Sequence, residues 1–367
     1  MKKIFIITGE ASGDKIASIV VSKLQEYNKN IIFKAVGGSN LKKQNVDCIF
    51  DIGEIAFMGI VDVVKNFLFI KRKFDLTVKE VLKFNPDIIL SVDSPDFSFR
   101  ILKKIKNINP KIKTFHIVAP QVWAWRENRK KSLNQFIDHL FLLFPFENKY
   151  FDGFIDNTFI GHPFFLKKLN INHETNNLNY ISICPGSRLT EIKTFMPLFI
   201  SLVQKLKSKF NYKFHIPTTS EKIKLIENFF VLNQINDFKI TTHEDEKNYY
   251  FRHSVLCIAK SGTIALDIMK NLSPLIVIYK TSWLNYFLIK PLVKVKFGNI
   301  INIIKDKMIV PELIQSDCNL DKLYNLTLNF LENDKLRLDN IKNYIEVINQ
   351  NLILRDGLDK LIQKLEI

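Results

Sequence analysis

The sequence predicts an α/β protein built from two doubly wound halves, and three features lead to this prediction. Short apolar runs alternate with amphipathic helical segments along most of the chain, which is the pattern of a parallel sheet joined by crossover helices. Two of these runs, residues 4–7 and 181–184, lead into a glycine-containing turn and then into a helical segment. A polar stretch at residues 170–179 separates the two halves and is typical of a linker.

The apolar runs predict the strands in order along the chain. After the first run at residues 4–7, strands are expected at residues 31–36, 88–92, 114–118, 139–143, 180–184, 212–216, 255–259 and 274–279. From about residue 321 the pattern is helical. We therefore expect one domain at residues 1–170, a second at residues 171–345, and a C-terminal helix at residues 346–367 that packs back on the first domain. In such sheets ligands bind at the carboxyl ends of the strands.

Composition narrows the class of protein. The chain has 367 residues, a formal net charge of +16, and four widely spaced cysteines without metal-ligand spacing. No apolar run approaches the ~18–20 residues of a spanning helix, and the first run is too short for a signal peptide. A cytosolic chain with reduced thiols is the simplest interpretation. The charge favours an anionic partner, although the abundance of Lys, Asn, Ile and Phe also fits an AT-rich genome. No nucleic-acid-binding motif is present, so we expect no nucleic acid partner.

The first glycine turn carries acids where a dinucleotide-binding turn would hold a phosphate. Residues 9–14 read Gly-Glu-Ala-Ser-Gly-Asp and lack the dinucleotide spacing of glycines. The carboxylates of Glu10 and Asp14 would repel a phosphate, so they suit general-base work or binding of a sugar hydroxyl better. The alternative is an ordinary strand–helix loop in which Asp14 caps the helix.

A second pair of acids follows the strand at residues 88–92. Asp93 and Asp96 flank a proline turn, and an aspartate at a strand end can accept a proton from a sugar hydroxyl. The alternative is that Asp93 bonds its own backbone, as turn aspartates commonly do.

Two turns in the second half suit a diphosphate. Residues 185–188 read Pro-Gly-Ser-Arg before a helix, where backbone N–H groups attract anions and Arg188 can grip a diphosphate with two parallel hydrogen bonds. The alternative is a surface arginine paired with Glu191. A similar turn, Ser261-Gly262-Thr263, precedes a helix whose Asp267 could hold a ribose diol; the alternative is a capped helix with a solvated Asp267.

Aromatic and apolar segments leave a choice between core and ligand contact. Trp123 and Trp125 either line a ligand site or fill the core under their loop, and we favour the core. Residues 58–73 are apolar on most of a helical circumference and end in Lys71-Arg72-Lys73. Such a helix is either buried or lies in a membrane interface with its cations among lipid head groups. Residues 283–290 form a second, aromatic-rich segment of this kind.

Taken in order, these motifs resemble the lipid-A-disaccharide synthases, which are inverting glycosyltransferases of the GT-B fold. The resemblance extends over most of the chain. Its motifs are residues 9–14 (GEASGD), 58–63 (MGIVDV), 93–97 (DSPDF), 122–126 (VWAWR), 161–163 (GHP), 185–191 (PGSRLTE), 261–263 (SGT), Asn302 and residues 311–315 (PELIQ).

The resemblance implies a fold and a reaction. Two Rossmann-like domains would face a central cleft, the first binding the acceptor and docking on the membrane, and the second binding a UDP-sugar. The enzyme would join UDP-2,3-diacylglucosamine to 2,3-diacylglucosamine 1-phosphate (lipid X) through a β-1,6 bond and release UDP, as a step in lipid A biosynthesis. It would need no cofactor and no metal, because basic groups and helix N-termini neutralise the leaving diphosphate.

The resemblance also implies roles for particular residues. Asp93 would be the general base on the acceptor 6-hydroxyl, with Glu10 beside it. The donor would be bound by Arg188, Glu191, Ser261, Gly262, Thr263, Asp267 and Asn302. On the cytoplasmic side, the acyl chains and the inner face of the inner membrane would be contacted by Met58, Ile60, Val61, Val64, Phe67, Leu68 and Arg72.

The chain departs from the family pattern at two places. Asp267 stands where the family usually has a longer Glu, which puts the ribose contact in doubt. Asp306 and Lys307 replace the usual glycine and arginine that follow the family's asparagine. Two other functions compete with the synthase: a GT-B UDP-sugar epimerase acting on a soluble substrate, and a non-enzymatic basic protein that binds membranes or nucleic acid. An epimerase has no use for an exposed apolar segment, so membrane association distinguishes it.

Overall fold

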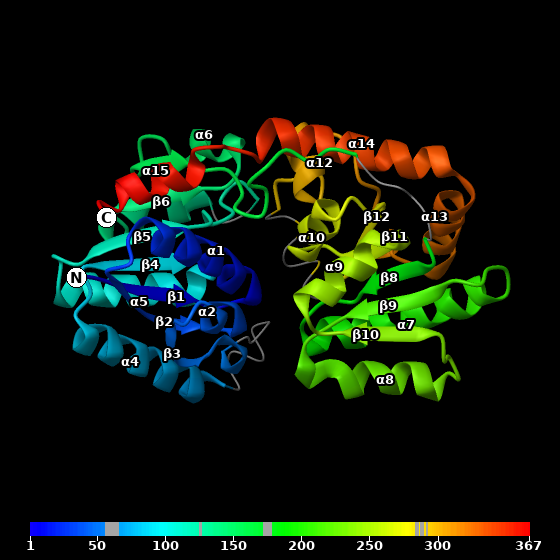
Figure 1. The fold of residues 1–367 in the computed structure, drawn as a ribbon, viewed down its shortest axis with the longest axis horizontal. Helices are drawn as coiled ribbons and strands as arrows, with labels where there is room; N and C mark the ends of the chain where they lie inside the picture. The colour runs from blue at the N-terminus through cyan, green and yellow to red at the C-terminus, as the bar shows by residue number, and fades with distance from the viewer. Residues whose placement is uncertain (56–65, 125–126, 172–177, 283–285, 287–289, 291–292) are drawn as a thin grey trace. The chain divides into compact units, whose positions relative to one another are not determined.

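A computed structural model describes residues 1–55, 66–124, 127–171, 178–282, 286, 290 and 293–367. Contacts divide the chain into two units (Figure 1). Unit 1 comprises Met1–Lys167 together with Asn351–Ile367, and unit 2 comprises Lys168–Gln350. Among the described residues, no helix has the length and apolar character needed to cross a membrane.

Unit 1 is built on a seven-stranded parallel sheet in the order β3-β2-β1-β4-β5-β6-β7. The connections run one way from β1 to β3 and the other way from β4 to β7, so β1 and β4 mark the topological switch point. The strands are β1 (Lys2–Thr8), β2 (Ile31–Gly37), β3 (Asp47–Asp51), β4 (Ile88–Val92), β5 (Lys113–Ile117), β6 (His139–Leu142) and β7 (Asn157–Phe159).

Helices complete unit 1. They are α1 (Ala11–Tyr27), α2 (Ser39–Lys43), α4 (Phe67–Phe84), α5 (Pro95–Ile108), α6 (Asn148–Phe151) and α15 (Gly357–Lys364), with 3-10 turns at Ile52–Glu54, Glu127–Gln135 and Pro145–Glu147. The centre of the sheet is apolar and fully buried, as in β1, whose Phe5 and Ile7 lie in the main core cluster. α15 packs against α1 and β7, so the C-terminal segment belongs to unit 1.

Unit 2 repeats the design with six parallel strands in the order β10-β9-β8-β11-β12-β13. Its switch point lies between β8 and β11. The strands are β8 (Tyr180–Cys184), β9 (Lys213–Pro217), β10 (Phe238–Thr241), β11 (Ser254–Lys260), β12 (Leu275–Tyr279) and β13 (Glu312–Ile314).

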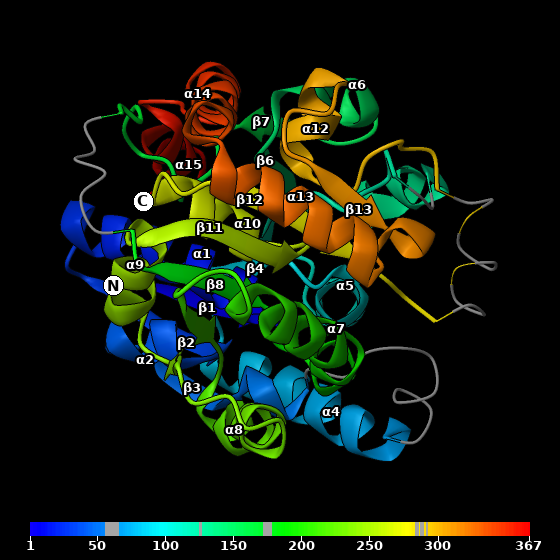
Figure 2. The ribbon, with the colours of Figure 1, turned by 90° about the vertical axis from the view of Figure 1, so that its right-hand side faces the viewer.

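The helices of unit 2 follow the same crossover pattern. They are α7 (Leu189–Lys207), α8 (Ile223–Leu232), α9 (Glu244–Arg252), α10 (Ile264–Lys270), α12 (Ile300–Lys305), α13 (Leu320–Glu332) and α14 (Asp334–Asn351), with 3-10 turns at Ser220–Lys222 and Gln315–Asp317. α7 and α13 pack side by side (Figure 2). The expected boundary at residue 345 falls within α14, and the units divide after Gln350.

The two doubly wound sheets confirm the predicted fold class. Each of the nine predicted strands is present, with ends that shift by a few residues at most. The four strands that were not predicted are β3, β7, β10 and β13, and these are the edge strands of the two sheets. Edge strands are short and partly exposed, so they lack the buried apolar run on which the prediction rests.

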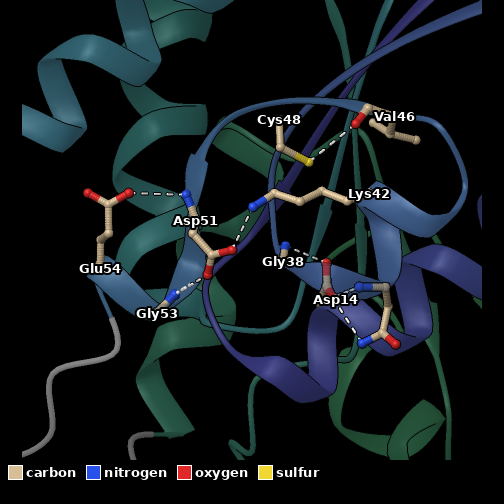
Figure 3. Close-up of polar contacts among 9 residues, drawn as sticks. Asp14, Gly38, Lys42, Val46, Cys48, Asp51, Gly53 and Glu54 are labelled. Atoms are coloured by element: carbon tan, nitrogen blue, oxygen red, sulfur yellow. Dashed lines mark hydrogen bonds and ion pairs between the residues drawn. The ribbon is translucent and has the colours of Figure 1, made fainter. Parts of the chain in front are cut away.

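The acid at the end of the first glycine turn has a structural role (Figure 3). Asp14 lies in the first turn of α1, but its carboxylate accepts hydrogen bonds from the backbone N–H of Gly38 (2.6 Å) and from the backbone and side-chain nitrogens of Asn40 (2.9 and 3.0 Å). It therefore caps α2 and fixes the turn after β2. Nearby, Lys42 pairs with Asp51 at 2.8 Å and ties α2 to the following turn.

We predict that Asp14→Asn destabilises the protein by about 2–4 kcal/mol, because the new amide group would face donors in a site that is almost fully buried. Urea unfolding followed by circular dichroism should show the loss as a lower midpoint. Asp75→Asn, on the exposed side of α4, is the matched control and should leave the midpoint within about 0.5 kcal/mol of wild type. Equal midpoints for the two variants would contradict the capping role.

Candidate functional site

The two acids expected to serve the acceptor lie at the switch point of unit 1. Glu10 follows β1 and Asp93 follows β4, and these strands are paired so that Thr8 lies opposite Val92. Glu10 is the N-cap residue of α1 and is partly buried. Both residues therefore stand at the carboxyl edge of the sheet, where doubly wound folds bind ligands.

Two neighbouring groups orient the Asp93 carboxylate by hydrogen bonds and leave part of its accepting capacity open. Its Oδ2 accepts a hydrogen bond from the Ser12 hydroxyl at 2.7 Å, and its Oδ1 accepts one from the Ser94 backbone N–H at 2.8 Å. A carboxylate can accept about four such bonds, and Asp93 is only partly buried. Gly13 permits this arrangement, because a Cβ there would lie 2.7 Å from the Val92 carbonyl oxygen and 3.1 Å from the Asp93 Cβ.

Backbone strain is concentrated at this edge of unit 1. Asp93 and Ser94 adopt φ values of +58° and +49°, and Val118, directly after the neighbouring strand β5, adopts +74°. Positive φ is a genuine outlier for a β-branched residue such as Val118. Strained residues persist where the surrounding structure enforces them, and they cluster at functional sites. The strain therefore supports a ligand site beside Asp93 independently of its carboxylate.

Two other titratable groups of unit 1, His116 and Glu147, are buried. The His116 Nδ1 lies 2.7 Å from the Ser91 hydroxyl, and burial lowers the pKa of His116 to about 3, so it stays neutral. Burial raises the pKa of Glu147 to about 7, although Glu147 accepts hydrogen bonds from the N–H groups of Trp123, Leu143 and Phe144. Trp123 is itself buried, which agrees with the core role expected for it, and Trp125 lies outside the described residues.

Unit 2 places two cations and one carboxylate at its own switch point. Arg188 follows β8 and Lys260 ends β11, and these strands are neighbours in the sheet. Glu191 Oε1 lies 3.4 Å from Arg188 Nη1 and 2.9 Å from Lys260 Nζ. The pairing of Arg188 with Glu191, one of the two interpretations of this motif, is therefore present. Lys260 belongs to the same turn as the Ser261-Gly262-Thr263 motif, which it directly precedes, but the sequence predicted no role for it.

Glu191 occupies the backbone groups that were expected to attract an anion. Its Oε2 accepts hydrogen bonds from the N–H groups of Ser187 (3.1 Å) and Arg188 (3.3 Å). The carboxylate packs directly over Gly186, which has φ of +105° and where a Cβ would lie 2.2 Å from Glu191 Oε2. The turn thus binds an anionic group, and in this structure that group is the protein's own Glu191 carboxylate.

The second turn and its helix are also held by protein groups. Ser261 donates from its backbone N–H to Ile278 (2.9 Å) and from its hydroxyl to the Gly298 carbonyl (2.7 Å), and Thr263 is the N-cap residue of α10. Asp267 is buried and pairs with Lys247 at 3.0 Å. Burial opposes the charge on Lys247, but the carboxylates of Asp267 and Glu244 outweigh it and raise the pKa of Lys247. Asp267 is therefore a buried ion-pair member, and the solvated alternative is wrong.

Asn302 is enclosed by its own loop. Its Nδ2 donates to the Val310 carbonyl (2.7 Å) and to Glu312 Oε1 (2.6 Å), and its Oδ1 accepts from the N–H groups of Ile309 (2.7 Å) and Val310 (2.8 Å). These four contacts match the amide's usual hydrogen-bonding positions, and Asn302 is fully buried. Burial raises the pKa of Glu312, which also accepts from Gly298 and Asn299. This arrangement joins the loop before α12 to β13.

The residues expected to dock on a membrane are described only in part. Met58, Ile60, Val61 and Val64 lie outside the described residues, as does most of the segment 283–290. The described part of the segment 58–73 is helical from Phe67, the first residue of α4. Leu68 and Phe69 are 70% and 38% exposed, and Arg72 is exposed. At these positions the burial alternative is wrong, because the apolar side chains face solvent.

Comparison with known proteins extends these observations. The family model described as Lipid-A-disaccharide synthetase matches residues 4–359. The lipid-A-disaccharide synthase of Rickettsia typhi is 32% identical over 348 residues, covering 92% of this chain and 91% of the relative. That of Rickettsia bellii is 35% identical over 353 residues, covering 91% of each chain.

A solved structure shows the same fold at much lower identity. The UDP-GlcNAc 2-epimerase from Neisseria meningitidis, bound to UDP-GlcNAc, aligns over the whole of both chains with a TM-score of 0.66 and 14% identity. At this identity the likeness is one of fold, and it carries no argument for an epimerase. The family match over nearly the whole length and the two synthase relatives decide the class of enzyme: the chain belongs to the lipid-A-disaccharide synthetase family and is a glycosyltransferase.

Proposed function

We propose that the chain transfers the diacylglucosaminyl group of UDP-2,3-diacylglucosamine to the 6-hydroxyl of 2,3-diacylglucosamine 1-phosphate, forming a β-1,6 bond and releasing UDP. The observation that carries this proposal is Asp93, a partly exposed carboxylate at the switch point of unit 1, oriented by Ser12 on a strained backbone. The direct test is to incubate the purified protein with both acylated substrates and to measure UDP release.

The proposed reaction is a single inverting displacement. Asp93 accepts the proton of the acceptor hydroxyl as the hydroxyl oxygen attacks the anomeric carbon of the donor. The bond from that carbon to the diphosphate breaks, and UDP leaves with the electron pair. Ser12 donates to the same carboxylate and fixes its direction. Glu10, on the neighbouring strand end, contacts the acceptor sugar.

The donor side of the proposal rests on unit 2. Arg188, at the end of β8, neutralises the charge that develops on the departing diphosphate, and the Ser261-Gly262-Thr263 turn lines the same edge. Glu191 and Asn302 act as positioning residues, because both are engaged by protein groups. Asp267 stays paired with Lys247, and the two side chains face the ribose as a pair.

The acylated substrates imply a membrane surface as a partner. We place the protein in the cytoplasm, bound peripherally to the anionic inner face of the inner membrane. The start of α4 supports this, since the exposed Leu68 and Phe69 precede the exposed Lys71 and Arg72. Apolar side chains that enter the acyl region, followed by cations at head-group level, are typical of interfacial helices.

We predict that Asp93→Asn lowers the transfer rate by at least about 100-fold, because the amide cannot accept the proton of the hydroxyl. Binding of UDP, measured by calorimetry, should stay within about twofold of wild type. Asp96→Asn, three residues further on and paired with Arg129, is the control and should retain near-normal turnover. Ser12→Ala should lower the rate less than Asp93→Asn does. Normal turnover by Asp93→Asn would contradict the base assignment.

We predict that the double variant Leu68→Ser, Phe69→Ser binds anionic vesicles at least about tenfold more weakly, because two apolar side chains no longer enter the bilayer. Co-sedimentation with phosphatidylglycerol-containing vesicles measures this. Val231→Ser, Leu232→Ser is the matched control, since these residues of unit 2 are 65% and 81% exposed. Equal losses in the two double variants would rule out α4 as the specific docking element.

A further inference from the structure

The proposed donor chemistry assigns no role to Lys260. It ends β11, one of the two strands that form the switch point of unit 2, and its side chain is 16% exposed. Its ammonium lies 2.9 Å from Glu191 and 5.7 Å from the centre of the Tyr279 ring, at the end of the next strand, β12. The side chain is thus directed along the carboxyl edge of the sheet.

The turn at residues 185–188 cannot bind a diphosphate through its backbone N–H groups alone. The N–H groups of Ser187 and Arg188 already donate to Glu191. An incoming diphosphate therefore meets side-chain cations in place of these two backbone groups. The side chains of Arg188 and Lys260 both contact Oε1 of Glu191. This carboxylate oxygen therefore brings together two cations that come from the ends of different strands.

The side-chain position of Gly262 is open on the side of Lys260. A Cβ built on Gly262 would meet only one described atom within 4 Å, the Lys260 Nζ at 3.9 Å. The backbone of the Ser261-Gly262-Thr263 turn and the ammonium group therefore border the same open space. A phosphate oxygen bound there would lie next to a full positive charge.

We propose that Lys260 is a second cation for the donor's diphosphate, acting with Arg188, and that Glu191 keeps the two cations in place until the nucleotide binds. This inference rests on the proposed function, because it assigns a residue to the same donor site. Arg188 offers a planar fork suited to bidentate contact, and Lys260 offers a compact point charge. Both contact the same Glu191 carboxylate, which holds them side by side for the diphosphate.

The arrangement has a consequence for the leaving group. While the donor is intact, its phosphates compete with Glu191 for the two cations. As the bond to the sugar breaks, negative charge grows on the departing phosphate oxygen, and the cations interact with it more strongly than with the bound donor. Interactions that strengthen in the transition state raise the rate of the chemical step.

Calorimetry with UDP, UMP and uridine tests the proposal on the full chain. We expect Lys260→Met to weaken UDP binding by about 10- to 100-fold, the usual range for a hydrogen bond to a charged group. Binding of uridine should be unchanged, and UMP should show a smaller loss than UDP. Lys260→Arg should recover at least part of the UDP affinity. Lys207→Met is the charge-matched control in unit 2, because Lys207 pairs with Asp237 at the surface, and it should bind UDP normally.

The alternative is that Lys260 only stabilises the fold through its pair with Glu191. That role predicts a lower thermal unfolding midpoint and equal losses for UDP and uridine, and this outcome would overturn the proposal. Lys260→Gln, which keeps a donor for Glu191 without the charge, provides the same test if Lys260→Met folds poorly. Normal UDP binding by a folded Gln or Met variant would also overturn it.

The experiment separates this inference from the proposed function. If the wild-type protein binds UDP in a Lys260-dependent way but releases none from the acylated substrates, the proposed transfer fails and the role of Lys260 stands. If transfer occurs and UDP binds equally well without Lys260, only the inference fails. Absence of UDP binding by the wild type would contradict both.

Discussion

Both halves of the chain depend on one topological constraint, the switch point between two central parallel strands, where successive strands begin to be added on the opposite side of the sheet. In a parallel sheet every strand delivers its carboxyl end to the same edge, and the connections on either side of the switch point leave in opposite directions. In unit 1 this places Glu10, Ser12 and Asp93 together, from β1 and β4. In unit 2 it places Arg188 and Lys260 together, from β8 and β11. Residues 72 or more positions apart in the sequence become neighbours for this reason alone.

A second constraint decides what each acid at these edges can do. A carboxylate taken from water must be paired or hydrogen-bonded. Asp14, Glu191 and Asp267 are buried and satisfied by N–H groups or cations, so their charge organises the protein. Asp93 accepts two hydrogen bonds and stays partly exposed, in line with the general-base role proposed for it. The acids at these edges therefore differ in burial, since Asp14, Glu191 and Asp267 are buried and Asp93 is only partly so.

The sequence predicts the centre of each sheet better than its edges. Interior strands such as β4 and β8 are almost fully buried runs of apolar residues interrupted by a single serine, and their observed bounds equal the predicted ones. The edge strand β7 is Asn-Thr-Phe, three partly buried residues, and has no periodic signal. Site positions follow the same logic, since a turn after an apolar run is visible in the sequence. The direction in which a site side chain points is not visible in the sequence, because it depends on partners such as Lys247 and Asn40 that come from other elements.

The division of the chain into units also sets the order in which they can be completed during synthesis. Unit 2 is continuous, from Lys168 to Gln350, whereas unit 1 takes its last helix, α15, from residues made after unit 2. At typical rates of ~5–20 residues per second, the first part of unit 1 waits roughly 10–40 s for that helix. During this time the surfaces of α1 and β7 that α15 later covers are open to solvent. The nascent first unit therefore leaves this surface uncovered until α15 has been made.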